Sequence, residues 1–246
     1  MDDVRRVKIC GITTQEDAAI AIRLGADALG FLVGLLYPTE DQLSPEKARS
    51  LVSSLPPLVT SVLVTHRSEI SEVAPLVEAV QANTLQLHGD FSPPDILELR
   101  RRFQFLKIIK AVHVDGEGAI ARALEAGPFV DAILLDTRTA TRLGGTGVTH
   151  DWSISWRIRH ALGDKPIILA GGLNPDNVGL AIETVQPFGV DVNTGVSERP
   201  GKKSPVLLSQ FISKAKGSFA DTHDLEVDAG KRAALEDARE LRSRFR

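Results

Sequence analysis

The sequence is poor in cysteine, and this scarcity limits the sites that it can build. Cys10 is the sole cysteine among 246 residues, so the chain forms no disulfide within itself. A zinc site with two cysteine and two histidine ligands is excluded for the same reason. The six histidines do not fall at metal-ligand spacing. We therefore expect no bound metal.

Long apolar runs and an excess of positive charge are also missing. No stretch of about 18 apolar residues occurs, the length that a membrane-spanning helix needs. The N-terminal residues MDDVRRVKIC are charged and lack the apolar stretch of a signal peptide. Lys and Arg number 29 against 32 Asp and Glu, a net charge of −3 that gives no sign of nucleic-acid binding. With the single cysteine, these features favour a cytoplasmic protein without membrane or nucleic-acid partners.

Eight short apolar runs alternate with eight stretches of helical periodicity. The predicted strands lie at 7–10, 28–33, 59–64, 84–87, 105–112, 131–135, 166–170 and 189–192. The predicted helices lie at 13–26, 44–55, 68–80, 92–103, 117–127, 151–162, 174–185 and 204–216. Most strands are nearly continuous apolar runs, which is typical of parallel strands buried on both faces. The alternation fits a closed barrel or a doubly wound sheet, and eight repeats in about 250 residues favour the (β/α)8 TIM barrel.

Local signals mark a helix start and the end of the barrel. Thr13, with Glu16 three residues later, predicts a capping box at the first helix. We expect the barrel to span 1–216 and residues 217–246 to form a C-terminal extension that begins as a polar linker. Its last part, 231–246, has the pattern of a charged amphipathic helix. A solvated appendage is the favoured interpretation of that helix, and an interaction helix is the alternative.

Two reactive side chains follow predicted strands at the barrel end where catalytic groups collect. Cys10 ends the first strand in KICGIT, where its sulfur is either a buried small apolar group or a thiolate base or nucleophile. Asp136 follows four apolar residues in AILLDT. It either caps the next loop or acts as an acid whose pKa is raised by burial. For Asp136, the role of an acid with a raised pKa is favoured.

Glycine-rich turns follow the last three predicted strands. They read GGTG at 144–147, AGGLNPDNV at 170–178 and VNTGV at 192–196. Glycine lets backbone N–H groups approach an anion closely, and a helix N-terminus adds its dipole. Because the loops after the seventh and eighth strands usually bind phosphate in such barrels, we predict a phosphate between residues 171–173 and 193–195.

These motifs occur in the order found in a known family. KICGIT, QLHGD, LLDT with GGTG and DW, AGGLNPDNV, and GVDVNTGV with PGKK make the chain resemble phosphoribosylanthranilate isomerase of tryptophan biosynthesis. The resemblance covers about residues 5–216. It implies a TIM barrel that carries out an Amadori rearrangement of a phosphoribosylamine, a small phosphorylated sugar, without a cofactor. It does not fix the oligomeric state, for which monomer and homodimer both stay open.

The resemblance also implies roles for the matching positions. Asp136 would protonate the ring oxygen of the sugar, and Cys10 would take the proton from C2. Phosphate would be held by Gly171, Gly172, Asn193, Thr194 and Gly195. Other substrate contacts would come from Lys8, Gln86, His88, Gly145 and Asp191.

The loop after the second predicted strand departs from the family pattern. There the family has an arginine that grips the anthranilate carboxylate, whereas this chain has Asp41 next to Glu40 in a loop that is two residues longer. Replacing a cation by two acidic residues beside a bound carboxylate changes attraction into repulsion. The lost charged hydrogen bond alone is worth about 1.5–3 kcal/mol of binding free energy. Arg138 and Arg142 lie in the lengthened loop after the sixth strand, and either could supply the missing cation. The alternative is that both are solvated charges of that loop.

Further departures cluster at the predicted mouth of the barrel. His66 stands where the family commonly has Asn, Asn193 and Thr194 replace Ser-Ser, and Ser197 stands where an acid is common. We include His66, Asp41 and Arg142 among the candidate substrate contacts. The main hypothesis is an isomerase of this family. The alternatives are a paralogue that acts on another phosphosugar, as isomerase, epimerase or lyase, and a non-catalytic phosphosugar-binding protein.

Overall fold

The computed structural model describes residues 6–37, 39–139, 142–143 and 149–217, with only the backbone at 138–139 and 142–143. The barrel strands are β1 (Arg6–Ile9), β2 (Ala28–Leu32), β3 (Thr60–Thr65), β4 (Thr84–Leu87), β5 (Lys107–His113), β6 (Ala132–Asp136), β9 (Ile167–Leu169) and β10 (Gly189–Val192). They are hydrogen-bonded in the closed order β1-β10-β9-β6-β5-β4-β3-β2, and every pair is parallel. The predicted TIM barrel is confirmed.

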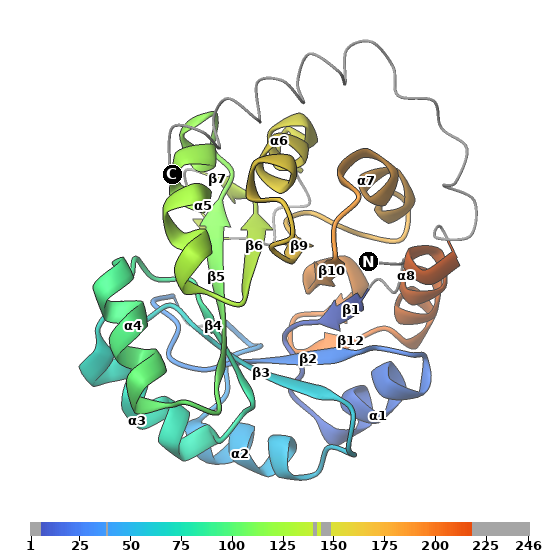
Figure 1. The fold of residues 1–246 in the computed structure, drawn as a ribbon. Coiled ribbons are helices and arrows are strands. Elements are labelled where there is room, and N and C mark those ends of the chain that lie inside the picture. Colours follow the sequence, from blue (N-terminus) through green and yellow to red (C-terminus); the bar gives the residue numbers. More distant parts are fainter. Residues whose placement is uncertain (1–5, 38, 140–141, 144–148, 218–246) are drawn as a thin grey trace.

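A helix follows each barrel strand and packs on the outside of the barrel (Figure 1). The helices are α1 (Gln15–Arg23), α2 (Pro45–Ser53), α3 (Ile70–Val80), α4 (Pro93–Arg102), α5 (Gly118–Ala126), α6 (Trp152–Leu162), α7 (Val178–Val185) and α8 (Pro205–Gly217). All eight lie within the predicted segments or one residue beyond them. Within the described residues, no helix combines the length and the apolar character needed to cross a membrane. The predicted linker after 217 and the helix at 231–246 lie outside the described residues.

Two predicted helix starts are wrong in detail. Helix α1 is capped by Thr14, whose side chain accepts from the N–H of Asp17, and not by Thr13 with Glu16. The Thr13 hydroxyl instead donates to the carbonyl of Gly201 at 2.7 Å. Tertiary contact has therefore overridden the local capping signal.

Helix α7 begins at Val178 and not at 174. Asn174 and Asn177 form a local turn before it, in which the N–H of Asn174 donates to Asn177 Oδ1 at 2.8 Å. Asn side chains commonly compete with helical hydrogen bonding in this way. The glycine turn after β9 is therefore followed by an ordered loop, and the helix begins only after it.

Two short hairpins were not predicted. One joins β7 (Arg138–Thr139) to β8 (Arg142–Leu143), and the other joins β11 (Ser197–Arg199) to β12 (Lys202–Lys203). A 3-10 turn, η2 (Thr194–Val196), leads from β10 into the second hairpin, and another, η1 (Gly127–Phe129), follows α5. The second hairpin extends the barrel mouth beside the predicted phosphate loops.

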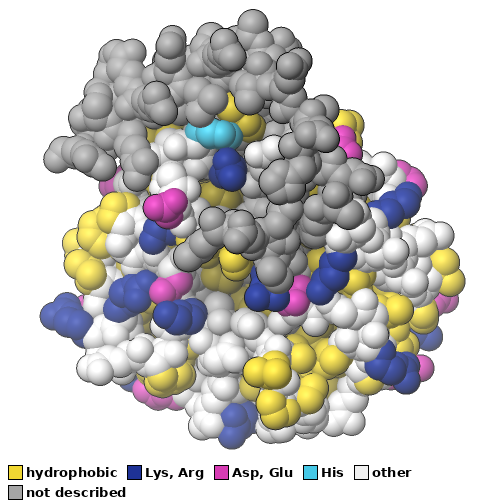
Figure 2. Space-filling model, turned by 45° about the vertical axis from the view of Figure 1, so that its right-hand side comes forward, with side chains coloured by type: hydrophobic (Ala, Val, Ile, Leu, Met, Phe, Trp, Pro, Cys, Tyr) yellow, Lys and Arg dark blue, Asp and Glu magenta, His cyan; other side chains and the backbone are white. Residues whose placement is uncertain are grey.

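Side chains along the barrel strands alternate between two apolar layers. On β6, Ile133 and Leu135 belong to the large layer between strands and helices. Ala132 and Leu134 belong to the smaller layer inside the barrel. The two-residue period of a strand therefore aims the next inward side chain, Asp136, into the barrel at its carboxyl end. On the face shown in Figure 2, the described Lys and Arg side chains are scattered among acidic and apolar ones.

Candidate active site

Cys10 and Asp136 line the same cavity at the carboxyl end of the barrel. The cavity has a volume of about 900 Å³. Cys10 follows β1 directly and its N–H donates to the carbonyl of Val192, and Asp136 is the last residue of β6. Both side chains are buried, with exposed fractions of 5% and 8%. The structure thus brings together the two reactive groups that the sequence singled out.

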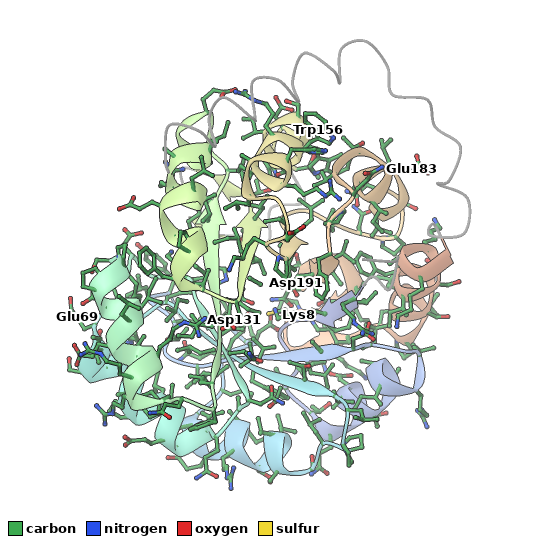
Figure 3. The ribbon with its side chains drawn as sticks, in the orientation of Figure 1. Lys8, Glu69, Asp131, Trp156, Glu183 and Asp191 are labelled. Carbon is green, nitrogen blue, oxygen red and sulfur yellow. The ribbon has the colours of Figure 1, made fainter. Side chains whose placement is uncertain are left out.

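A buried ion pair lies inside the barrel with these two groups. Lys8 Nζ lies 2.9 Å from Asp191 Oδ1, and Figure 3 shows the two side chains inside the ring of strands. The pairing follows from strand register, because Lys8 of β1 is directly opposite Asp191 of the adjacent strand β10. Lys8 precedes Cys10 by two residues and therefore faces the same interior.

The ion pair acts on the two reactive groups in opposite senses. Burial raises the pKa of Cys10, the Lys8 ammonium lowers it, and Asp191 raises it again, so the net direction is upward. Burial and the Asp191 carboxylate raise the pKa of Asp136 to about 7, against the hydrogen bond from the Thr137 N–H. At neutral pH a large share of Asp136 therefore carries a proton that it is able to donate.

Gly30 on β2 makes the room that this arrangement needs. A Cβ at this position would lie 2.8 Å from Cys10 Sγ and 3.1 Å from Lys8 Nζ. The inward side of β2 is therefore left bare where the sulfur and the ammonium approach. No reading of the sequence singled out this glycine, because the contact joins two different strands.

The predicted phosphate loops lie side by side at the carboxyl ends of β9 and β10. Gly171 and Gly172 have φ values of +81° and +70°, which side chains with a Cβ rarely adopt. A Cβ on Gly195 would collide with the carbonyl oxygen of Leu173, so the two loops touch through bare backbone. The N–H groups of Thr194 and Gly195 open the turn η2, and the first N–H groups of a helical turn have no partner within it. This geometry suits an anion.

All five predicted phosphate-binding residues line the cavity: Gly171, Gly172, Asn193, Thr194 and Gly195. The predicted substrate contacts that also line it are Asp41, His66, Gln86, His88 and Asp191. Gly145 lies outside the described residues. Arg142 is described only by its backbone in β8, as Arg138 is in β7.

A row of three histidines stands at the ends of β3, β4 and β5. The ring centroids of His66 and His88 are 5.3 Å apart, and those of His88 and His113 are 6.0 Å apart. Burial lowers the pKa of His66. Burial, with the neighbouring rings of His66 and His113 and then the ammonium groups of Lys8 and Lys110, lowers the pKa of His88 well below its ordinary value. Both rings are therefore neutral at pH 7. Among the described residues, no group of three or more His, Cys, Asp or Glu is arranged to hold a metal ion.

Gln86 connects this row to the barrel interior. Its Nε2 lies 2.6 Å from Nε2 of His88, so the amide donates to that ring nitrogen and His88 carries its proton on Nδ1. The amide oxygen of Gln86 is buried and accepts no hydrogen bond from the described residues. Gln86 also lines the cavity, so its side chain forms part of the wall against which a substrate would lie.

Asp41 is bound by protein groups, although it lines the cavity. Its Oδ2 accepts from Asn193 Nδ2 at 3.0 Å, and its Oδ1 accepts from the N–H of Gly201 at 2.8 Å. The fully buried Lys203 donates to Asn193 in turn. The carboxylate thus ties the loop after β2 to the β11–β12 hairpin. Sequence reasoning missed the role of Lys203, and it also missed Arg199 in the cavity wall.

Comparison with known proteins gives consistent matches over the barrel. The sequence pattern of N-(5'-phosphoribosyl)anthranilate (PRA) isomerase matches residues 7–214. The chain is 39% identical over 225 residues to N-(5'-phosphoribosyl)anthranilate isomerase 2 of Methanosarcina mazei, covering 91% of this chain and 99% of that protein. It is 42% identical over 211 residues to the isomerase of Methanothrix thermoacetophila, covering 86% of this chain and 98% of that protein.

Solved structures agree with the sequence matches. The crystal structure of phosphoribosyl anthranilate isomerase from Thermotoga maritima superposes with a TM-score of 0.74 at 41% identity, covering 87% of this chain and 100% of that chain. A phosphoribosyl anthranilate isomerase in complex with reduced 1-(o-carboxyphenylamino)-1-deoxyribulose 5-phosphate superposes with a TM-score of 0.70 at 39% identity and the same coverage.

Proposed function

The chain belongs to the N-(5'-phosphoribosyl)anthranilate isomerase family, and on this basis we propose that Asp136 and Cys10 are its general acid and general base. The protein is an aldose–ketose isomerase of tryptophan biosynthesis that acts on phosphoribosylanthranilate. The family membership does not favour an epimerase, a lyase or a non-catalytic binding protein.

The first chemical step is the opening of the sugar ring. The protonated carboxyl of Asp136 donates its proton to the ring oxygen, the bond from C1 to that oxygen breaks, and the lone pair of the anthranilate nitrogen forms a Schiff base. A donor with a pKa of about 7 suits this step at neutral pH, because it is both protonated in part and able to give the proton up. That raised pKa, in a carboxyl buried beside the cavity, is the observation that carries the proposal.

The second step is the removal of the C2 proton. The Cys10 thiolate takes this proton, and the electron pair of the C–H bond forms the double bond between C2 and C1 of the enolamine. The enolamine then becomes the aminoketose when C1 gains a proton and the C2 hydroxyl loses one. The proton gained by Cys10 balances the one given by Asp136. Burial and Asp191 raise the pKa of the Cys10 thiol, and the nearby Lys8 ammonium supports this role because it acts in the opposite direction and favours the thiolate.

The remaining polar groups would hold the substrate. The bare backbone of the loops at 171–173 and 193–195 would bind the phosphate, supported by the positive φ values of Gly171 and Gly172. Gln86, which lines the cavity, would contact the sugar. The single cysteine supports a cytoplasmic location. A monomer or homodimer is expected, and light scattering of the purified protein would measure which of the two forms.

Complementation of a tryptophan auxotroph that lacks the isomerase tests the proposed function. We expect the wild-type chain to restore growth without tryptophan, and the Asp136→Asn variant to fail at the same protein level. No growth with well-folded wild-type protein would contradict the activity. Growth with both chains would contradict the role of Asp136 alone.

A further inference from the structure

The proposed substrate carries two anionic groups at opposite ends, a phosphate and the carboxylate of the anthranilate ring. The bare-backbone loops after β9 and β10 account for the phosphate. A carboxylate that enters the cavity and meets no donor loses hydration without a compensating hydrogen bond. Some group on another part of the cavity wall must therefore receive it.

The charged lining of the cavity is mostly acidic. Five acids face it, namely Glu40, Asp41, Asp136, Asp191 and Glu198. Among the described lining residues, Arg199 is the one Lys or Arg. The lining histidines, His66 and His88, have lowered pKa values and are neutral at pH 7. Arg199 is therefore the permanent cation that the described part of this wall offers to an anion.

The hairpin that carries Arg199 is fixed against the loop after β2. The carboxylate of Asp41 accepts a hydrogen bond from the N–H of Gly201 at the tip of the hairpin. Thr13 donates to the carbonyl of the same glycine, and a Cβ on Gly201 would lie 3.2 Å from the carbonyl oxygen of Glu40. These contacts place Arg199 at the junction of the two segments, on a support held from both sides.

The same contacts hold the carboxylate of Asp41 in hydrogen bonds to other protein groups, and not in an ion pair with Arg199. Both carboxylate oxygens accept from protein donors, one from Asn193 and one from Gly201. The buried ammonium of Lys203 is close enough for the charge of Asp41 to raise its pKa against the effect of burial. Asp41 is thus a support for the hairpin and is no longer free to pair with Arg199.

Arg199 itself is available. Its side chain is exposed at the cavity rim, and within the described part of the chain it takes part in no side-chain hydrogen bond or ion pair. Leu35 and Tyr37 of the loop after β2 line the same cavity and provide apolar and aromatic surface for a benzene ring. A planar guanidinium matches a carboxylate with two parallel hydrogen bonds.

We propose that Arg199 binds the carboxylate of the anthranilate ring and selects the aglycone of the substrate. This inference rests on the proposed function. It makes Arg199 a specificity-determining residue carried by the β11–β12 hairpin, with Asp41 as a positioning residue that anchors the hairpin.

A comparison of two substrates tests the proposal. The kcat/KM of the full-length wild type, Arg199→Ala and Arg199→Lys is measured with phosphoribosylanthranilate and with N-phosphoribosylaniline, which lacks the carboxylate. We expect Arg199→Ala to lose roughly 10- to 100-fold with the first substrate, the value of a charge-assisted hydrogen bond, chiefly through KM. With N-phosphoribosylaniline, the kcat/KM of Arg199→Ala should equal that of the wild type. Arg199→Lys should lie between the two, because it keeps the charge and loses the planar fork.

Lys202→Ala is the matched control. It removes one positive charge from the same hairpin, at an exposed position that does not line the cavity, and should change neither substrate's kcat/KM. An equal loss with both substrates in Arg199→Ala would overturn the proposal, since it would place Arg199 on the phosphate or in the fold. Wild-type activity in Arg199→Ala would also overturn it. A wild type that turns over neither compound would instead refute the proposed function.

Discussion

Lys8 and Asp191 form a buried ion pair inside the barrel, with Nζ and Oδ1 2.9 Å apart and the two side chains 4% and 9% exposed. The pair is shared by two catalytic candidates, because Lys8 lowers and Asp191 raises the pKa of both Cys10 and Asp136. Removing one partner of a buried pair leaves an uncompensated charge and commonly costs 3–5 kcal/mol, about what a marginal protein is able to lose. Burial is the larger cause of both shifts, and the pair adjusts the protonation of the two groups in addition to its effect on stability.

The first prediction concerns the thiol of Cys10. We expect Lys8→Met to raise its pKa further and Asp191→Asn to lower it, because the two charges act on the thiolate with opposite sign. Ultraviolet absorbance of the thiolate measures this directly, since the chain has a single cysteine. Shifts of the same sign in both variants, or no shift in either, would contradict the opposite effects of the two charges on the thiol.

The second prediction concerns stability as a function of pH. The pKa of Asp136 is about 7 in the folded chain against an ordinary 3.8, so the folded state holds its proton more tightly than the unfolded state. The stability that this proton contributes is complete below pH 3.8 and is lost as the pH rises through 7. The total is on the order of 4 kcal/mol.

Asp136→Asn should therefore be more stable than the wild type above pH 7, and this advantage should shrink as the pH falls toward 4. Denaturant unfolding of both proteins at several pH values measures the difference. Asp131→Asn is the control, because the pKa of that surface carboxyl is lowered and its charge is favoured by the fold; this variant should lose stability at neutral pH. A constant difference between wild type and Asp136→Asn at all pH values would contradict the raised pKa.

The third prediction concerns Gly30. Its replacement by Ala puts a Cβ 2.8 Å from Cys10 Sγ, so the sulfur has to move. We expect kcat to fall on the order of 100-fold, as for a displacement of about 1 Å in a catalytic group, with a stability loss of about 1–3 kcal/mol from overpacking. Gly217→Ala is the control, because a Cβ there meets nothing within 4 Å. Unchanged kcat in folded Gly30→Ala would refute the positioning of Cys10.

The fourth prediction concerns the phosphate loops. Gly195→Ala pushes a Cβ against the carbonyl of Leu173 and separates the two loops. We expect the inhibition constant of inorganic phosphate to rise roughly 10-fold or more, as for the loss of one hydrogen bond to a charged group. A crystal of the wild type soaked in sulfate should hold the anion between 171–173 and 193–195. An anion bound only elsewhere, or unchanged phosphate inhibition, would count against this site.

The barrel strands were predictable because continuous apolar runs such as AILL at 132–135 leave few alternatives. The β11–β12 hairpin was not, because its strands consist of Ser, Glu, Arg and Lys, which show no apolar alternation. It exists through tertiary contacts, chiefly that of Asp41 with Gly201. The same contacts explain why Asp41 looked like a repulsive group in the sequence and lies in the structure as an anchor.

In the candidate site, too, some features could be predicted from the sequence and others depend on tertiary structure. Cys10 and Asp136 were predictable because each follows an apolar strand, and a strand end is a position that sequence reveals. The pairing of Lys8 with Asp191, 183 residues apart, depends on the register between the first and last barrel strands. The clearance at Gly30 depends on neighbouring strands as well, and neither relationship leaves a local signal.

Turnover of phosphoribosylanthranilate by the purified wild type, Cys10→Ala and Asp136→Asn tests the acid–base assignment most directly. We predict that the wild type converts this substrate to the aminoketose, and that each variant, folded as judged by circular dichroism, loses turnover by at least about 1,000-fold, within the usual range for a general acid or base. Near-wild-type turnover in either folded variant would contradict the role of that residue.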